Sequence, residues 1–158
     1  MPDSADTEEL DEKGPPLGAV LDFMRVLWGL DHALQSASKR MESTFGMTGP
    51  QRLAVRIVGR FPGIAAGRLA EILHVHPSTL TGVLRRLEGR GILQRRPDPR
   101  DARRALFMLT AKGRKVDTIR TGTVEQAVRR VLLKDPQKVS AAQEVLSSLS
   151  VELDAGLR

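Results

Sequence analysis

A chain of 158 residues with 41% hydrophobic but only 3% aromatic side chains is long enough for one packed domain with an aliphatic core, and this profile favours helices. The absence of cysteine excludes disulfide bonds, thiolate zinc sites and thiol-based redox sensing. A formal net charge of +6 singles out no class of partner, and no apolar run approaches the roughly 20 residues that a membrane span needs.

Residues 1–16 are predicted to form a disordered acidic tail, because they contain few apolar residues and end in Gly14-Pro15-Pro16. This segment holds six acidic residues and one lysine, a net charge of −5, so the rest of the chain carries +11. A body that basic suits a polyanion such as nucleic acid, although a merely solvated basic surface has the same signature. The segment lacks the basic and apolar regions of a signal peptide, and we expect a cytoplasmic protein.

Helical periodicity begins at Leu17 and continues for about 27 residues. Apolar side chains recur at spacings of three and four and spread over more than one face of this helix, namely Val20, Phe23, Met24, Val26, Leu27, Leu30, Ala33, Leu34 and Met41. A helix that is apolar on several sides needs more than one neighbour. The pattern therefore predicts a homodimer.

Three shorter helices are predicted between Thr48 and Gly91. The first begins at the Thr48 N-cap and ends at Phe61-Pro62-Gly63. The second covers residues 64–75, and the third covers residues 78–90 and is closed by Gly91. Two short helices joined by a tight turn form a helix-turn-helix.

The helix predicted over residues 78–90 has an apolar and a polar face. On a helical wheel the core side carries Leu80, Val83, Leu84 and Leu87. The opposite side and its flanks carry Ser78, Thr79, Thr81, Gly82, Arg85, Arg86, Gly89 and Arg90. Hydroxyl and guanidinium groups on a helix that enters the major groove can bond base edges and phosphates, so this face is the candidate recognition surface. A solvated helix surface is the alternative.

Two short strands, Ile92–Arg96 and Ala105–Leu109, are predicted to form a hairpin with a long charged tip. The segment holds five arginines, which are Arg95, Arg96, Arg100, Arg103 and Arg104. The first two lie near the base of one strand and suit phosphate contacts, whereas the last three lie at or near the tip and suit a minor groove. Asp101 lies two residues before Arg103 and is expected to orient its guanidinium. A solvated loop is the alternative.

The remaining chain predicts two helices and no internal repeat. One begins at Thr110 and is broken by Asp135-Pro136. The last carries apolar residues at spacings of three and four, namely Val139, Ala142, Leu146, Leu149 and Leu153.

Several motifs in this order resemble the MarR family of dimeric winged-helix transcription regulators. They are Leu69-Ala70, His76-Pro77-Ser78-Thr79-Leu80-Thr81, Leu87-Glu88-Gly89-Arg90-Gly91-Ile92-Leu93, Asp98-Pro99-Arg100-Asp101-Ala102-Arg103 and Leu109-Thr110-Ala111-Lys112-Gly113. The resemblance covers essentially residues 17–158 and implies a mainly α (α+β) fold. It implies a winged helix-turn-helix lobe over residues 47–110, with a small β-hairpin wing, and a helical dimerisation region over residues 17–46 and 111–158.

The resemblance also implies roles for individual residues. Each subunit of the dimer would place its recognition helix in the major groove of half a palindrome and its wing in the flanking minor groove. By position, Arg103 becomes the minor-groove residue and Asp101 its orienting partner. The groove and phosphate contacts become Ser78, Thr79, Thr81, Arg85 and Arg86. Two departures bear on base preference, because His76 replaces a common serine N-cap and Gly82 a common arginine.

Many members of this family release DNA when a small, often anionic or phenolic, compound binds between the dimerisation helices and the winged-helix lobe. Trp28, Asp31 and His32 are unusual entries on a long apolar helix and are the candidate lining of such a pocket. Satisfied core or interface residues are the more common interpretation of such side chains.

Other kinds of chemistry have little support. His74 and His76 are expected to be a turn residue and an N-cap rather than metal ligands, because no acidic pair has matching spacing. No nucleophile and base are grouped and no Gly-rich phosphate loop is present, so we expect no enzymatic activity and no cofactor. The sequence predicts a DNA-binding regulator, a repressor rather than an activator. Its competitors are an architectural protein that coats DNA without reading sequence and a dimeric sensor that acts through a protein partner.

Overall fold

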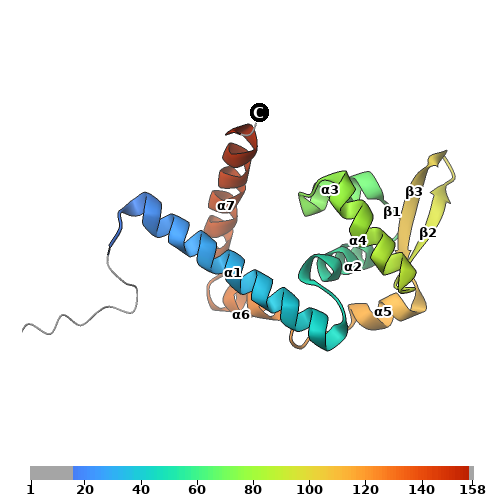
Figure 1. Ribbon diagram of the computed structural model, residues 1–158, viewed down its shortest axis with the longest axis horizontal. Coiled ribbons are helices and arrows are strands. Elements are labelled where there is room, and N and C mark those ends of the chain that lie inside the picture. The colour runs from blue at the N-terminus through green and yellow to red at the C-terminus, as the bar shows by residue number, and fades with distance from the viewer. Residues whose placement is uncertain (1–15, 157–158) are drawn as a thin grey trace, which may run out of the picture.

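The computed structural model describes residues 16–156, so the tail predicted over residues 1–16 lies outside the described residues except for Pro16. Its elements in chain order are α1 (Ala19–Phe45), α2 (Gly49–Arg60), β1 (Ile64–Ala65), α3 (Ala66–Leu73), α4 (Pro77–Gly89), β2 (Leu93–Asp98), β3 (Asp101–Leu109), α5 (Ala111–Asp117), α6 (Val124–Lys134) and α7 (Pro136–Gly156). We call residues 47–117 the lobe, and α1, α6 and α7 together the arm. Figure 1 shows the arm extending to one side of the lobe, with α7 standing away from it.

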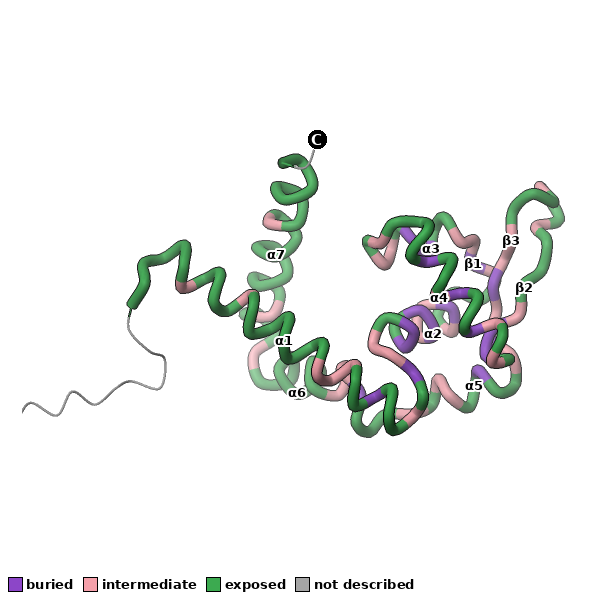
Figure 2. The backbone as a smooth tube through the Cα atoms, viewed as in Figure 1, coloured by how far each residue is buried: buried purple, intermediate pink, exposed green. Residues whose placement is uncertain are grey.

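The arm begins with α1, a single helix of 27 residues, as the periodicity predicts. Most of its surface is exposed, and Met41 is its one buried residue (Figure 2). No residue of α6 or α7 is buried. The predicted apolar stripes are therefore present, but no other helix or strand within residues 16–156 covers most of their length.

The lobe contains the hydrophobic core. The buried face of α4 is the predicted one, because Leu80, Leu84 and Leu87 are buried. They pack with apolar residues of α2, α3 and the sheet, which include Val55, Val58, Leu69, Ile92 and Phe107. The N-terminus of α2 is closed by a capping box in which Thr48 and Gln51 bond each other's backbone N–H groups.

The sheet of the lobe has three antiparallel strands in the order β1-β3-β2, one more than predicted. Residues 64–75 are predicted as one helix, but Ile64 and Ala65 form β1 and pair with Phe107 and Leu106. The prediction is wrong here because a two-residue strand is defined by a partner more than forty residues away. Local periodicity carries no signal of such a pairing.

The wing formed by β2 and β3 is longer than predicted and its tip is shorter. The regular register runs from Leu93 opposite Leu109 to Pro97 opposite Ala105, and then jumps to Asp98 opposite Asp101. Residues 102–104 therefore form a bulge on β3, and the turn itself consists of residues 99–100. The prediction of a long charged loop at the tip is wrong, because β2 extends to Asp98 and β3 begins at Asp101, which leaves only residues 99–100 between the strands.

The single helix predicted after Thr110 is two helices. Thr110 caps α5 by accepting a hydrogen bond from the Gly113 backbone N–H at 3.0 Å. The helix ends at Asp117, and α6 starts at Val124 after a connection in which Gly122 has a left-handed φ of 71°. Apolar spacing continues across this break, so the period alone did not show it.

A second glycine lets α5 pack closely against the backbone at Ile92. Gly113 is buried, and a Cβ atom at this position would collide with the carbonyl oxygen of Ile92.

Within residues 16–156, no helix combines the length and apolar character that crossing a membrane requires.

Candidate nucleic-acid interface

The turn of the helix-turn-helix is built by two histidines. His74 ends α3 in a left-handed conformation with φ 51°. His76 is the N-cap of α4, and its Nδ1 accepts from the Ser78 backbone N–H at 3.3 Å and lies 2.7 Å from Ser78 Oγ. The predicted N-cap is confirmed. Within residues 16–156, no three His, Asp or Glu side chains gather closely enough to hold a metal ion.

The outward face of α4 is exposed and polar. The exposed residues on this helix include Ser78, Thr79, Thr81, Gly82, Arg85, Arg86 and Gly89. Thr81 donates its hydroxyl proton to the Pro77 carbonyl at 2.9 Å, so the oxygen keeps lone pairs to accept a bond from outside. Neither Arg85 nor Arg86 forms an ion pair with a carboxylate in the described part of the chain.

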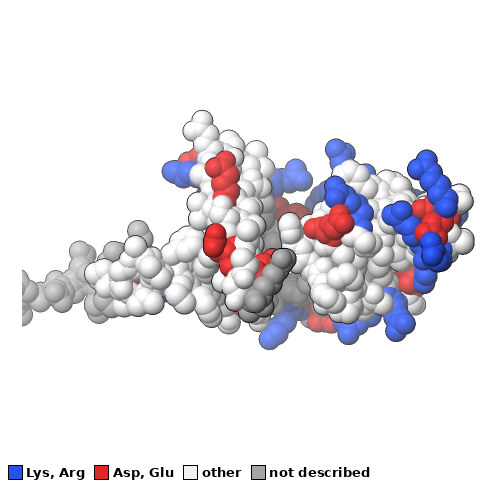
Figure 3. Space-filling model, turned by 90° about the horizontal axis from the view of Figure 1, so that it is seen from above, with Lys and Arg blue, Asp and Glu red and all other residues white. Residues whose placement is uncertain are grey.

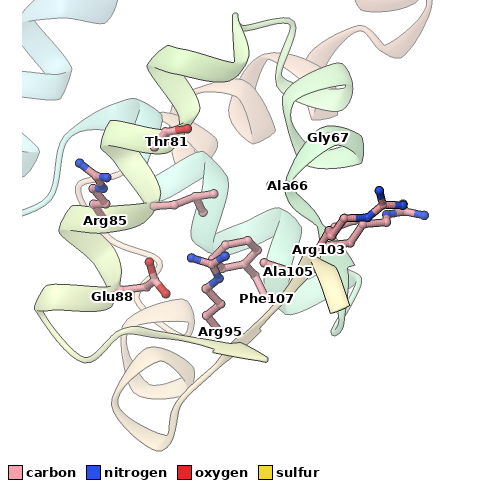
Figure 4. Close-up of a pocket in the computed structure, with 12 residues that line it drawn as sticks. Ala66, Gly67, Thr81, Arg85, Glu88, Arg95, Arg103, Ala105 and Phe107 are labelled. Atoms are coloured by element: carbon pink, nitrogen blue, oxygen red, sulfur yellow. The ribbon is translucent and has the colours of Figure 1, made fainter. Parts of the chain in front are cut away.

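A cleft of about 410 Å³ lies between α4 and the wing. It brings together five of the residues singled out in the sequence, which are Thr81, Arg85, Arg95, Arg103 and Arg104. In Figure 4, Arg85 and Glu88 project from α4 on one side, Arg95 lies between the two walls, and Arg103 extends outward on the wing side. The recognition helix and the wing therefore place cationic residues along the two sides of one cleft.

The other candidate contacts lie outside this cleft. Ser78, Arg86, Arg96 and Arg100 are exposed but are not among its lining residues. Thr79 lines a different groove, between lobe and arm. Sequence reasoning also missed Glu88, which lines the cleft one helical turn after Arg85. That spacing, three residues along one helix, was the signal that could have identified it.

The wing tip is ordered by two aspartates, as predicted for one of them. Asp101 Oδ1 accepts from the backbone N–H and from Nε of Arg103, each at 3.1 Å. These hydrogen bonds from Arg103 lower the pKa of the Asp101 carboxyl. Asp98 Oδ1 accepts from the Arg100 backbone N–H at 2.9 Å. The Arg103 side chain remains 91% exposed, so Asp101 orients the guanidinium without covering it.

Charge is concentrated on the lobe. Residues 47–117 contain fifteen Lys or Arg and five Asp or Glu, so this part carries nearly all of the positive charge of the body. Figure 3 shows blue side chains gathered over the lobe and wing, whereas the face of the arm seen in this view is mostly white with acidic groups on α7. The most basic surface therefore coincides with the cleft and its two walls.

A second, larger groove of about 630 Å³ lies between arm and lobe. Most of its lining is apolar, with side chains such as Leu34, Met41, Leu53, Val83 and Val124. The predicted pocket residues Trp28, Asp31 and His32 do not line it and are exposed. The α1 residues that line it begin at Leu34, beyond those three positions along the helix, which is why they miss it.

The lobe matches a known family. Residues 47–105 fit the model of the MarR family. Transcriptional regulator HosA of Escherichia coli O111:H- is 39% identical over 70 residues, which are 44% of this chain and 52% of that protein. The HTH-type transcriptional repressor Rv2887 of Mycobacterium tuberculosis is 32% identical over 92 residues, 58% of this chain and 66% of that protein.

The matched segment spans only about half the length of HosA. The fold extends the likeness over more of the chain. The Staphylococcus aureus MepR–DNA complex superposes with a TM-score of 0.70 at 21% identity, covering 80% of this chain and 97% of MepR. The helix-turn-helix, the wing and the long helices beside them occur in the same arrangement. The lobe belongs to the MarR family.

Proposed function

We propose that this protein is a sequence-specific, DNA-binding transcription regulator that acts as a homodimer. The observation that carries the proposal is the cleft whose lining includes Thr81 and Arg85 of α4 on one side and Arg95, Arg103 and Arg104 of the wing on the other. Clustered guanidinium groups on a helix and a narrow hairpin suit two neighbouring grooves of one duplex. The names of HosA and Rv2887 as regulators support the same class of function.

In this proposal α4 enters the major groove and the wing enters the flanking minor groove. Ser78, Thr79, Thr81, Arg85 and Arg86 supply base and phosphate contacts from the helix. Arg95 and Arg96 contact phosphates, and Arg103 enters the minor groove beside Arg100 and Arg104 with Asp101 as its partner. The two hydrogen bonds that Arg103 donates to Asp101 Oδ1, one from the backbone and one from Nε, support this role, because an oriented guanidinium loses less entropy on binding.

The dimer is proposed from the arm. Large exposed apolar side chains gather on it and include Val20, Phe23, Trp28, Leu30, Val131, Leu132, Val151 and Leu153. Contiguous apolar surface of this kind marks an interface in a water-soluble protein. Residues 17–46 and 111–158 would form the dimerisation region and residues 47–110 the DNA-binding region, with α5 attaching the two.

We further propose that the protein represses transcription and that a small molecule bound between arm and lobe releases the DNA. The groove of about 630 Å³ supports the second point, since its size and apolar lining suit an organic ligand. Rv2887 is named a repressor, which supports the first.

The decisive experiment separates a regulator from a protein that coats DNA. Purified protein is used to select fragments of the host genome, and the enriched palindrome and a scrambled copy are titrated at two salt concentrations. A regulator prefers the palindrome by about 10³ or more, whereas non-specific binding shows steep salt dependence and little discrimination. A preference below about tenfold contradicts the proposal.

A further inference from the structure

The lobe and the arm are joined at two places along the chain. One is the turn at Gly46, between α1 and the lobe, and the other is the connection over residues 118–123, between α5 and α6. Two single-chain connections define a hinge rather than a rigid joint. Whatever fixes the angle of the lobe on the arm must therefore come from side chains.

Arg52 of α2 spans the second connection. Its side chain is only 4% exposed, and its Nη1 donates to the Val116 carbonyl at 2.7 Å. Its Nη2 donates to the Ile119 carbonyl at 2.6 Å, and its Nε to Glu125 Oε1 at 3.0 Å. One guanidinium thus holds the end of α5, the connection and the first turn of α6. The sequence analysis did not single out this residue.

Three further side chains complete this arrangement. Arg56 Nη1 donates to Asp117 Oδ1 at 2.6 Å, and its Nε lies 3.4 Å from Glu125 Oε1. We call Arg52, Arg56, Asp117 and Glu125 the joint cluster. Glu125 Oε2 is buried without a hydrogen-bond partner, so the arginines supply the compensation for this carboxylate.

A fifth residue holds the first connection. Arg90, the C-cap of α4, donates from Nη1 to the Gly46 carbonyl and lies within 3.5 Å of the Phe45 carbonyl. The end of the recognition helix is therefore bonded directly to the end of α1. Because that connection is already anchored on α4, the remaining freedom of the lobe lies at the connection that Arg52 spans.

We propose that Arg52 is a positioning residue that fixes the lobe on the arm and thereby sets the half-site spacing that the dimer accepts. This inference rests on the proposed function. Recognition helices of a dimer must lie about one helical turn, roughly 34 Å, apart. A spacing error of one base pair displaces and rotates a half-site, so only a rigid joint can reject it.

The chemistry of arginine suits this task better than an apolar contact. Its planar guanidinium presents several donors in fixed directions, whereas the hydrophobic effect between apolar side chains has no preferred direction. Two of its bonds, to the Val116 and Asp117 carbonyls, fix the guanidinium within the lobe. The other two, to the Ile119 carbonyl and the Glu125 carboxylate, then hold the connection and α6 in a defined direction from it.

The joint itself is tested by distance measurement on the full chain. The protein has no cysteine, so paired spin labels can be attached through Arg25→Cys on α1 and Gly89→Cys on α4, in double-labelled chain diluted with unlabelled chain. We expect Arg52→Met to broaden the distance distribution at least about twofold. Arg60→Met, an exposed arginine on the same helix, is the matched control. Equal widths in the two variants would overturn the inference.

Spacing selectivity is tested on operators whose half-sites are moved apart or together by one base pair. We expect the wild type to lose at least about tenfold in affinity and Arg52→Met less than about threefold. An equal loss on every spacing means that Arg52 only supports the fold. Glu125→Ala, which leaves the carbonyl bonds of Arg52 intact, carries the same test if Arg52→Met does not fold.

A wild type that prefers no palindrome contradicts the proposed function and with it the spacing role. The widths of the spin-label distance distributions still show whether Arg52 fixes the lobe on the arm. Failure of the proposed function can therefore be distinguished from failure of the inference about Arg52.

Discussion

The lobe and the arm use the same aliphatic residues in opposite ways. Of the buried hydrophobic residues, all but Met41 lie in the lobe, whereas most large exposed hydrophobic residues lie in or beside the arm. In the lobe only Leu53 and Phe61 belong to the exposed set. The lobe is therefore a complete folding unit in one chain, and the arm has the composition of a core without the contacts of one.

Charge divides the molecule along the same line. The lobe combines a closed core with a surface rich in arginine, which keeps it soluble and ready for a polyanion. The three helices of the arm hold seven Lys or Arg and seven Asp or Glu, so their charges cancel, and they leave apolar side chains in water (Figure 2). Burial against a second copy removes that cost, so the contrast supports one protein–protein surface and one DNA surface per chain.

The largest expected effect is on dimer stability, when a charged side chain is introduced on the apolar surface of the arm. Leu30→Glu on α1 would bury a carboxylate in the proposed dimer interface at a cost of about 4 kcal/mol, roughly a thousandfold in the dimer dissociation constant. Sedimentation velocity measures the result. Phe61→Glu makes the same change on an exposed lobe residue and should leave the dimer intact. If both variants dissociate, or neither does, the arm is not distinguished from the lobe as the dimer interface.

The second prediction concerns the core of the lobe. Leu87 is fully buried, so Leu87→Ala should lower the free energy of unfolding by about 3 kcal/mol. Leu53→Ala, at a site that is 48% exposed, should cost less than about 1 kcal/mol. Urea unfolding at constant protein concentration gives both values. Similar costs at the two sites would mean that the lobe core is not tightly packed.

Substitution of Arg85 tests whether the polar face of α4 recognises DNA or is only a solvated basic surface. Arg85→Ala should cost about 1 to 3 kcal/mol of operator affinity and relax the preference at one base position. Fluorescence anisotropy on operators substituted one base pair at a time measures this. A uniform loss would reduce Arg85 to a phosphate contact, and no loss at all would favour a sensor that acts through a protein partner. Arg60→Ala, outside the cleft, is the matched control.

Arg103 tests the wing in the same way with a smaller expected change. Arg103→Ala should weaken operator binding by about 1 kcal/mol, close to fivefold, while the dimer survives because the arm is untouched. Fluorescence anisotropy measures the operator affinity, and sedimentation velocity on the same sample measures whether the dimer is intact. Wild-type affinity in this variant would contradict the assignment of the wing to the minor groove.

The smallest effect is the pH dependence of the wing tip. Hydrogen bonds from Arg103 place the pKa of Asp101 below its ordinary value of 3.8. A depressed pKa in the folded state means that the pair stabilises the tip above pH 3.8 and stops doing so as the pH falls through the folded pKa. NMR titration of the Asp101 carboxyl should show a midpoint below 3.8 that rises in Arg103→Ala. An unchanged midpoint would show that Arg103 does not hold this carboxylate in solution.

Much of the local structure was readable from the sequence. The N-caps at Thr48 and His76, the buried stripe Leu80, Leu84 and Leu87, and the pairing of Asp101 with Arg103 depend on residues close together in the chain. Short-range rules of spacing and capping are enough for such features. The family and the winged helix-turn-helix follow from the same local motifs.

Long-range features needed the tertiary structure. Strand β1 exists because Ile64 meets Phe107, and the register of the wing produces a bulge at Arg103 that no local rule predicts. The groove between arm and lobe excludes Trp28, because α1 reaches the lobe only beyond Leu34. The role of Arg52 depends on carbonyls sixty-four or more positions away in the chain.

The division has one physical cause. Helix periods, caps and turn residues act over a few positions and are written in the order of the side chains. Whether an arginine faces water or is buried against the end of another helix depends on which distant segments pack beside it. Arg52 and Arg60 lie on the same helix and have the same side chain. Only the three-dimensional packing buries Arg52 and gives it hydrogen-bond partners on distant segments, whereas Arg60 stays exposed.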